Sequence, residues 1–244
     1  MSKRQEILEY IKKNQTSNIN IINFIENYPI DYIERIGDSV IVKGTSDRSW
    51  VYISSNSRDE LQTVKSKLDS DDKCFAIIED WMMPILTEDC NIRWKLSTMR
   101  LILDKRSTFE IGESLSDETT EKLSELSPKD AEFIYENSDY KDFLSIEYII
   151  DRITNGESSC IRNFDKLIAW AITQDDGAIG FLHVLPEHRK KGYGREVTMD
   201  LINKVIEKNK IPFAHIEEDN ISSMNLVTSL GFKKDKIVNW FEIE

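Results

Sequence analysis

The stretch GAIGFLHVLPEHRKKGYG, residues 177–194, decides the fold that we expect for this chain. Residues 178–185 are almost all apolar or aromatic, which predicts a strand buried on both faces, and Pro186 ends it. A basic turn follows. Apolar residues spaced by three and four between Val197 and Ile206 then predict a helix with one buried side. A strand, a glycine-containing turn and a helix are therefore expected in direct succession.

The turn has the features of an anion-binding site. Gly192 and Gly194 allow a tight bend whose N–H groups converge at the helix start, where the helix dipole favours negative charge. The cationic side chains that flank the two glycines are Arg189, Lys190, Lys191 and Arg195. Because the whole chain has a net charge of −12, this local positive charge predicts that a phosphate group is held here.

The pattern Arg189-x-x-Gly192-x-Gly194 resembles the pyrophosphate-binding signature of the GNAT superfamily of acyl-CoA-dependent N-acyltransferases, Gln/Arg-x-x-Gly-x-Gly/Ala. The resemblance covers about the last hundred residues, because the later segments follow in the order of that family. They are a strand over residues 212–218, then Asn220, a short helix, and Leu230-Gly231-Phe232.

A finer resemblance is to the glycine N-acyltransferase-like branch. It rests on IPFAHIEEDN, residues 211–220, and on a terminal aromatic strand with Trp240 and Phe241.

The resemblance implies an α/β (α+β) fold, with a C-terminal GNAT domain whose mixed, mostly antiparallel sheet is flanked by helices. It implies acetyl-CoA or another acyl-CoA as co-substrate and no metal. It also implies a bulge at Val184-Leu185 whose N–H groups meet the pantetheine arm and the thioester carbonyl. The residues expected to bind the co-substrate are Val184, Leu185, Arg189, Lys190, Lys191, Gly192, Tyr193, Gly194, Arg195, Asn220 and Ser223.

Acyl transfer to an amine needs a proton acceptor, and the candidates are Glu217, Glu218 and His183. Stripping a lysine-like amine of its proton at neutral pH costs about 4 kcal/mol, which such a group helps to supply. We expect His183 and His215 to face the same region from two strands, with alternation placing His215 and Glu217 on one face. The structural alternative is that these are solvated strand ends or a hydrogen-bonded core histidine.

The residue that protonates the departing thiolate is not evident. Much of the superfamily has a tyrosine in the helix before the terminal Gly-Phe, and the matching position here is Val227. Three explanations stay open. Solvent protonates the sulfur, or Ser222, Ser223 or Asn225 does so, or the protein binds acyl-CoA without fast turnover.

Composition limits the other function classes. The 244 residues are 40% hydrophobic and contain no apolar run long enough to cross a bilayer and no secretion signal, so we expect a cytoplasmic globular protein. The acidic balance argues against nucleic acid as a partner. A small-molecule amine or amino acid acceptor is expected instead, with the protein a monomer or homodimer. Cys74, Cys90 and Cys160 predict buried free thiols rather than a disulfide framework or a zinc site.

The predicted domains are residues 1–105, a linker or exposed hairpin over residues 106–120, and the GNAT domain over residues 121–244. The first part shows two helices, three strands, a helix that begins after Ser57 with Glu60 completing a capping box, and further strands. That order is a GNAT fold without its signature turn. A degenerate GNAT-like domain and an unrelated α+β domain both fit, and neither interpretation gives this part any chemistry.

The favoured function is an N-acyltransferase that moves an acetyl or other acyl group from acyl-CoA to a primary amine by direct attack in a ternary complex. An acyl-CoA-binding sensor or scaffold without fast turnover is the alternative. A generic nucleotide-binding protein fits less well, because the G-x-G-x-x-G spacing and the P-loop Gly-Lys-Ser/Thr are both missing from the sequence.

Overall fold

The computed structural model describes residues 1–103 and 121–244. The predicted linker or hairpin therefore lies outside the described residues. The chain divides into two compact units. The first unit comprises Met1–Leu101, Ile216–Ile221 and Lys234–Glu244, and the second comprises Ile102–His215 and Ser222–Lys233.

The units are not contiguous in sequence, which differs from the predicted C-terminal block of residues 121–244. The terminal strand β11 (Lys233–Ile243) pairs antiparallel with β4 (Cys74–Glu79) of the first unit. Phe241 of β11 is fully buried and stacks on Phe75 of β4, with ring centroids 4.7 Å apart. The end of the chain thus supplies a core strand to the first unit.

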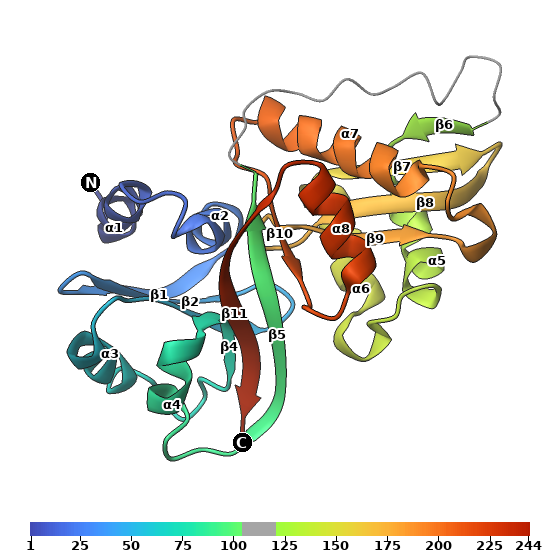
Figure 1. The fold of residues 1–244 in the computed structure, drawn as a ribbon. Helices are drawn as coiled ribbons and strands as arrows, with labels where there is room; N and C mark the ends of the chain where they lie inside the picture. The colour runs from blue at the N-terminus through green and yellow to red at the C-terminus, as the bar shows by residue number, and fades with distance from the viewer. Residues whose placement is uncertain (104–120) are drawn as a thin grey trace. The chain divides into compact units, whose positions relative to one another are not determined.

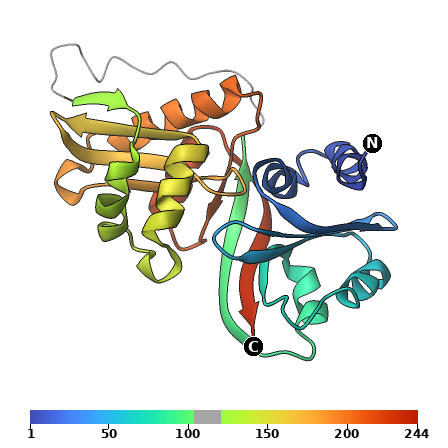
Figure 2. The same ribbon diagram turned by 180° about the vertical axis from the view of Figure 1, so that it is seen from behind.

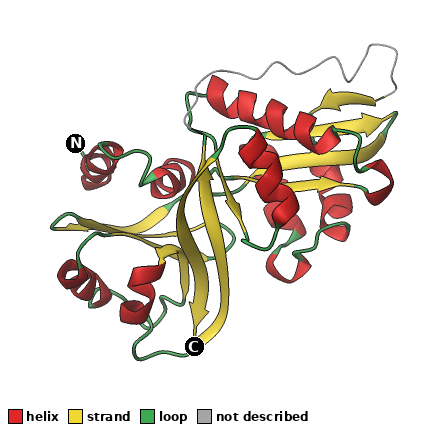
Figure 3. Ribbon diagram, in the orientation of Figure 1, coloured by secondary structure: helices red, strands yellow, loops and turns green. Residues whose placement is uncertain are grey.

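The first unit is a mixed sheet with helices on both faces, and its strands follow the order β1-β2-β3-β4-β11-β5 (Figure 1, Figure 3). Its other elements are α1 (Lys3–Lys12), α2 (Ile19–Asn27), β1 (Ile30–Ile36), β2 (Ser39–Thr45), β3 (Ser49–Ser54), α3 (Arg58–Lys65), the 3₁₀ helix η1 (Asp80–Met82), α4 (Met83–Leu86) and β5 (Ile92–Ile102).

Strand alternation divides the buried side chains of this unit between two cores. Val40 and Val42 of β2 pack with α1 and α2 on one face. Ile41 of β2 and Val51 of β3 pack with α3 and α4 on the other face. The apolar residues between Trp81 and Leu86 lie in η1 and α4 and pack into this second core.

Only one of the two hydrogen bonds of the capping box predicted for α3 is present. The Ser57 hydroxyl accepts the N–H of Glu60 at 3.3 Å, as expected. The Glu60 carboxylate instead accepts the N–H of Asp38 and the hydroxyl of Ser39, the latter at 2.6 Å. A contact distant in sequence therefore replaces the local one.

In the second unit, helices cover both faces of a sheet with the strand order β10-β9-β8-β7-β6. Strands β6 to β9 are antiparallel, and β9 and β10 are parallel. The elements are β6 (Glu121–Ser124), η2 (Pro128–Asp130), α5 (Ala131–Glu136), η3 (Lys141–Phe143), α6 (Ile146–Asn155), β7 (Ser158–Asn163), β8 (Lys166–Thr173), β9 (Ile179–Val184), η4 (Pro186–His188), α7 (Tyr193–Glu207), β10 (Phe213–Ile216) and α8 (Ile221–Ser229).

The long helix α7 lies over β7, β8 and β9, and α5 and α6 lie on the opposite face of the same sheet (Figure 1, Figure 2). Val197, Leu201 and Ile202 of α7 are fully buried, in agreement with the predicted one-sided helix. The predicted mixed, mostly antiparallel sheet flanked by helices is confirmed.

The cysteines differ from the prediction of three buried thiols. Cys160 is buried, but Cys74 and Cys90 are partly exposed. Burial raises the pKa of the Cys160 thiol, and partial burial raises the pKa of the Cys74 thiol. Both groups are therefore poor thiolates at neutral pH.

Within the described residues, no helix combines the length and the apolar character needed to cross a membrane.

Candidate functional site

The turn between β9 and α7 forms an open helix start. Gly192 is the N-cap of α7 and has φ 89°, a left-handed conformation that favours glycine. Lys190 also has a positive φ, of 61°. No side chain caps the helix at Gly192. The first turn of this 15-residue helix therefore lacks the side-chain acceptor that usually satisfies its N–H groups.

The main-chain donors of this turn are available to a ligand. In the described structure, the N–H groups of Lys190, Lys191, Gly192 and Gly194 make no hydrogen bond. A Cβ atom added at Gly192 would meet nothing within 4 Å, so the space in front of the helix start is open. Alternating backbone conformations with converging N–H groups form an anion-binding concavity.

The flanking cations are exposed, and two of them are held by the protein. Arg189 donates from Nε to the carbonyl oxygen of Val184 at 3.0 Å. Arg195 donates from Nη1 to the hydroxyl of Ser229 on α8 at 3.2 Å. Lys190 and Lys191 are exposed beside them. We name Arg189–Arg195 the phosphate turn, since its donors and charges suit a diphosphate.

Tyr193 was predicted within this turn and is buried rather than open to a ligand. Its ring lies 6.3 Å from that of His188, centroid to centroid. The structure therefore gives the Tyr193 side chain a packing role.

Strand β9 contains a bulge, but not where it was predicted. Trp170 of β8 is opposite His183 and Ile172 is opposite Gly180, so Phe181 and Leu182 together face one residue of β8. Phe181 has φ 50° at this bulge. The expected bulge at Val184-Leu185 is wrong: Val184 is in register, and Leu185 donates its N–H to Ile168 at 3.0 Å.

The same strand is less buried than its apolar sequence predicted. Ile179 is buried, whereas the residues from Gly180 to Val184 are all partly exposed. The parallel pairing of β9 with β10 places Ala214 opposite Ile179, and β9 continues beyond this pair to Val184. An apolar, bulged edge is thus left where the two strands part, next to the phosphate turn.

His183 lies on this edge, packed against Trp170. The two rings stack with centroids 4.7 Å apart and an interplanar angle of 19°. Burial, and then the positive charge of Arg189, lowers the pKa of His183 below its ordinary value. His183 is therefore neutral at pH 7 and able to accept a proton.

His215 does not share this environment. Its ring is buried, with Nε2 3.3 Å from Oδ2 of Asp176 in the turn between β8 and β9. Sequence reasoning missed this pair because alternation along β10 says nothing about a partner in another turn. The only signal was the Asp175-Asp176-Gly177 turn that precedes β9.

The remaining predicted residues lie in the connection from β10 to α8 and in α8 itself. Glu217, Glu218 and Asn220 belong to the first unit, and their relation to the phosphate turn stays a prediction. Ser223 is a partly exposed residue of α8. Val227 of α8 is 4% exposed, so an aliphatic core side chain occupies the position at which an acid was sought.

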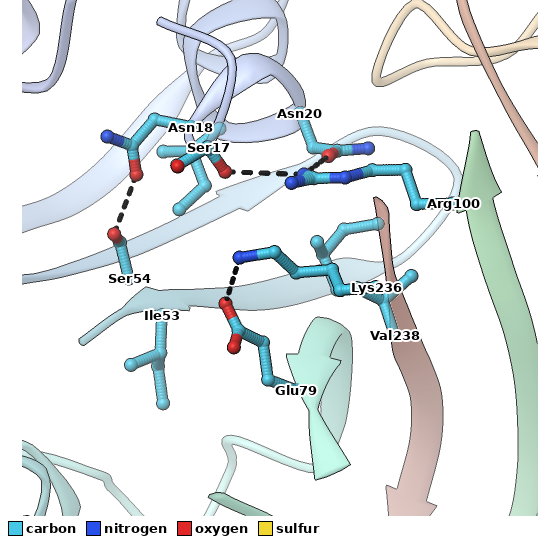
Figure 4. A pocket seen from close by; sticks show the side chains of 11 residues that line it. Ser17, Asn18, Asn20, Ile53, Ser54, Glu79, Arg100, Lys236 and Val238 are labelled. Carbon is cyan, nitrogen blue, oxygen red and sulfur yellow. Dashed lines mark hydrogen bonds and ion pairs between the residues drawn. The ribbon is translucent and has the colours of Figure 1, made fainter. Parts of the chain in front are cut away.

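The first unit also contains a small cavity lined by charged and polar side chains (Figure 4). Arg100 is fully buried beside it and donates to Oδ1 of Asn20 at 2.7 Å, and its Nη2 lies 2.6 Å from Oδ2 of Asp235. Lys236 pairs with Glu79 at 2.7 Å. The cavity measures about 20 Å³, enough for roughly one water molecule. Since its charges are already paired, we assign it to structure.

No group of three or more His, Cys, Asp or Glu side chains that could hold a metal ion occurs among the residues that the structure describes.

Comparison with known proteins finds a family-model match over part of the chain and several solved structures with a similar fold. Residues 160–241 match the family model described as FR47-like protein. A Drosophila melanogaster protein of known structure is 15% identical, with a TM-score of 0.80, and the match covers 100% of this chain and 97% of that one.

Two further structures carry descriptions of their family. A GCN5-related N-acetyltransferase from Kribbella flavida is 11% identical, with a TM-score of 0.59 and coverage of 93% and 94%. A tandem GNAT protein from the clavulanic acid biosynthesis pathway is 11% identical, with a TM-score of 0.53 and coverage of 93% and 87%. At these identities the likeness is one of fold, and it confirms the GNAT fold that the sequence predicted. The finer resemblance to the glycine N-acyltransferase-like branch stays a prediction.

Proposed function

We propose that this chain, which has the fold of tandem GNAT proteins and an FR47-like segment over residues 160–241, is an acyl-CoA-dependent N-acyltransferase. In this proposal an acyl group, most simply acetyl, passes from coenzyme A to the primary amine of a small molecule or amino acid. The amine attacks the thioester directly in a ternary complex.

The observation that carries the proposal is the uncapped, glycine-centred start of α7. In the described structure, the N–H groups of Lys190, Lys191, Gly192 and Gly194 have no acceptor. The exposed cations around them are Arg189, Lys190, Lys191 and Arg195. A diphosphate supplies the acceptors and the negative charge that this turn lacks. The partly exposed apolar edge of β9 next to it suits the pantetheine arm, and Asn220 and Ser223 stay candidate contacts to its amides.

The remaining chemistry divides between main chain and side chains. A bulge leaves main-chain N–H groups of β9 out of the ladder, and such donors stabilise the oxygen of a thioester under attack. Neutral His183, two residues beyond Phe181, is a candidate to take the first proton from the substrate ammonium. Glu217 and Glu218 stay the other candidates.

Binding of coenzyme A tests the turn directly. We expect the double variant Arg189→Gln/Lys191→Gln to raise the Kd for coenzyme A at least about tenfold, because each charge-assisted contact contributes about 1.5–3 kcal/mol. Gly192→Val should do the same through the backbone, since φ 89° is strained for a branched residue. Titration calorimetry measures both.

Lys129→Gln is the matched control, because Lys129 is an exposed lysine of the same unit that lies outside the phosphate turn. It should leave the Kd unchanged. Equal Kd values for the wild type and the phosphate-turn variants would remove the assignment of this turn.

Turnover distinguishes an enzyme from a sensor. Release of free thiol from acetyl-CoA is followed with a panel of amines that includes glycine, which also tests the glycine N-acyltransferase-like hypothesis. We expect release that depends on the amine. The aliphatic Val227 favours the alternative, an acyl-CoA-binding sensor without fast turnover, and binding without release by any amine would support it.

A further inference from the structure

Helix α6 holds the turn between β8 and β9 through two side chains on one of its faces. Tyr148 and Arg152 are four residues apart, so they lie one above the other on the helix. The Tyr148 hydroxyl accepts the N–H of Asp175 at 3.3 Å. Nη1 of Arg152, whose side chain is 3% exposed, donates to the carbonyl oxygen of Gln174 at 3.3 Å. Helix α6 therefore contacts two consecutive residues of this turn.

The same turn packs against the strand directly before the bulge of β9. Gln174 donates its main-chain N–H to the carbonyl oxygen of Ala178 at 2.8 Å, which closes the turn. Its side chain covers Gly180, because a Cβ atom added at Gly180 would lie 2.8 Å from Nε2 of Gln174. A glycine within a strand often marks such a close approach. The residue before the bulge is thus in contact with the turn that α6 holds.

The bulge itself has a backbone conformation that needs support. Phe181 has φ 50°, which is unfavourable for a bulky side chain and persists only where the surrounding structure holds it. The pairing of β9 with β8 resumes on both sides of it. The ring of Phe181 lies 6.0 Å from the ring of Tyr148, centroid to centroid, at an interplanar angle of 48°. Aromatic rings attract one another at this separation. Tyr148 therefore contacts both the bulge and the turn that precedes it.

We propose that Tyr148 is a positioning residue for acyl transfer, which holds the bulge at Phe181 in place through the contact between the two rings; this rests on the function proposed above. In that function, main-chain N–H groups at the bulge stabilise the thioester oxygen. Such donors are effective only when they are already in place before the reaction. Tyr148 is not required to touch the reacting atoms. It acts on the transition state through the placement of the bulge, and coenzyme A binding does not depend on it.

The main test is Tyr148→Leu, which removes the ring and keeps an apolar side chain. We expect kcat to fall by about 10–10³-fold, since the loss of one main-chain donor costs about 10²–10³-fold and a small misplacement can cost about 10²-fold. The Kd for coenzyme A and the KM for acyl-CoA should stay within about threefold, because the phosphate turn is unchanged.

Tyr148→Phe tests whether the ring is the part that matters. It loses the hydroxyl that accepts the N–H of Asp175 and keeps the contact with Phe181. We expect kcat within about threefold of the wild type, so the ring alone should restore most of what Tyr148→Leu loses. Phe164→Leu, at an exposed turn of the same unit, is the matched control and should change neither kcat nor Kd.

A double-mutant cycle tests whether the two rings act together. If Tyr148 works through Phe181, the double variant Tyr148→Leu/Phe181→Leu should be no slower than the slower of its two single variants. The coupling between the amide and α protons of Phe181 provides a readout other than activity, because it reports φ. In NMR spectra of the free protein, it should change in Tyr148→Leu and stay unchanged in Tyr148→Phe.

The outcomes separate this proposal from the one on which it rests. Failure of the wild type to release thiol with any amine would remove both. Turnover by the wild type with an unchanged kcat in Tyr148→Leu would overturn the positioning role alone. Equal losses of kcat in Tyr148→Phe and Tyr148→Leu would overturn it as well, and so would losses that multiply in the double variant.

Discussion

At the scale of single residues, Asp130 ties a helix start to a strand within the second unit. One carboxylate oxygen accepts the N–H of Ser127 and Nη2 of Arg162, both at 2.7 Å. Burial alone would raise the pKa of Asp130, but the hydrogen bonds and the charge of Arg162 outweigh it and lower the pKa. The folded pKa lies below the unfolded one, so this stabilisation is present above about pH 4 and is lost as pH falls through the folded pKa.

We therefore predict that Asp130→Asn lowers the free energy of unfolding by about 1–2 kcal/mol at pH 7. The difference from the wild type should shrink as pH falls below about 4, where Asp130 itself becomes protonated. Urea unfolding at several pH values measures this. Asp165→Asn, an exposed acid of the same unit, should change stability by less than about 0.5 kcal/mol. An equal loss for Asp130→Asn at pH 7 and pH 3 would contradict the pKa argument.

Single residues also show why the sequence predicted the glycine turn before α7 and missed other contacts. Gly192 and Arg189 were predictable because a glycine–cation turn before a helix has a local physical role. The pairing of His215 with Asp176 depends on two segments meeting in space, as does that of Arg100 with Asp235. Nothing in the residues next to each partner specifies such a pair.

At the scale of elements, α3 and α7 are two helices in the same kind of connection with opposite starts. Each follows a strand that runs parallel to the strand after it, β3 to β4 and β9 to β10. Ser57 caps α3 with its hydroxyl, whereas α7 starts at Gly192 without a side-chain cap. The first unit satisfies its helix start with a side chain, and the second unit leaves its helix start without a side-chain cap.

This contrast predicts different results for changes at the two helix starts. Ser57→Ala should lower the free energy of unfolding by about 1 kcal/mol. Ser57→Gly should lower it by only about a few tenths of a kcal/mol, because glycine is tolerated at an N-cap. Neither should alter the Kd for coenzyme A, in contrast to Gly192→Val. Chemical denaturation and titration calorimetry measure the two effects. Weakened coenzyme A binding by Ser57→Ala would assign ligand binding to α3 as well.

Strand β9 shows the limit of apolar patterns as a signal. Its sequence predicted burial on both faces, yet the residues after Ile179 are partly exposed. An apolar run indicates that the faces of a strand are shielded from water. It does not distinguish shielding by a packed helix from shielding by a bound ligand. The bulge at Phe181 was equally hidden, since it arises from the register with β8 and not from a glycine or proline.

At the scale of the whole molecule, the main difference from the sequence-based picture is the assignment of β11. A polar stretch near residue 105 suggested a boundary, and everything after residue 121 was assigned to one domain. Polar composition locates an exposed connection but does not reveal a strand that returns to the other unit. The aromatic residues of β11 were recognised correctly as a terminal strand, but Phe75, the partner of Phe241, could not be identified without the fold.

The role of β11 leads to a prediction about the stability of the first unit. Phe241→Ala removes a fully buried ring that stacks on Phe75 and should lower the free energy of unfolding by about 3–5 kcal/mol. Hydrogen exchange should show the loss of protection in β3 and β4, which share this core, while amides of β7 and β8 keep theirs. Phe164→Ala, at an exposed turn, should change protection in neither set. Equal loss in β7 and β8 would mean that the two units unfold together, because destabilising one would then expose both.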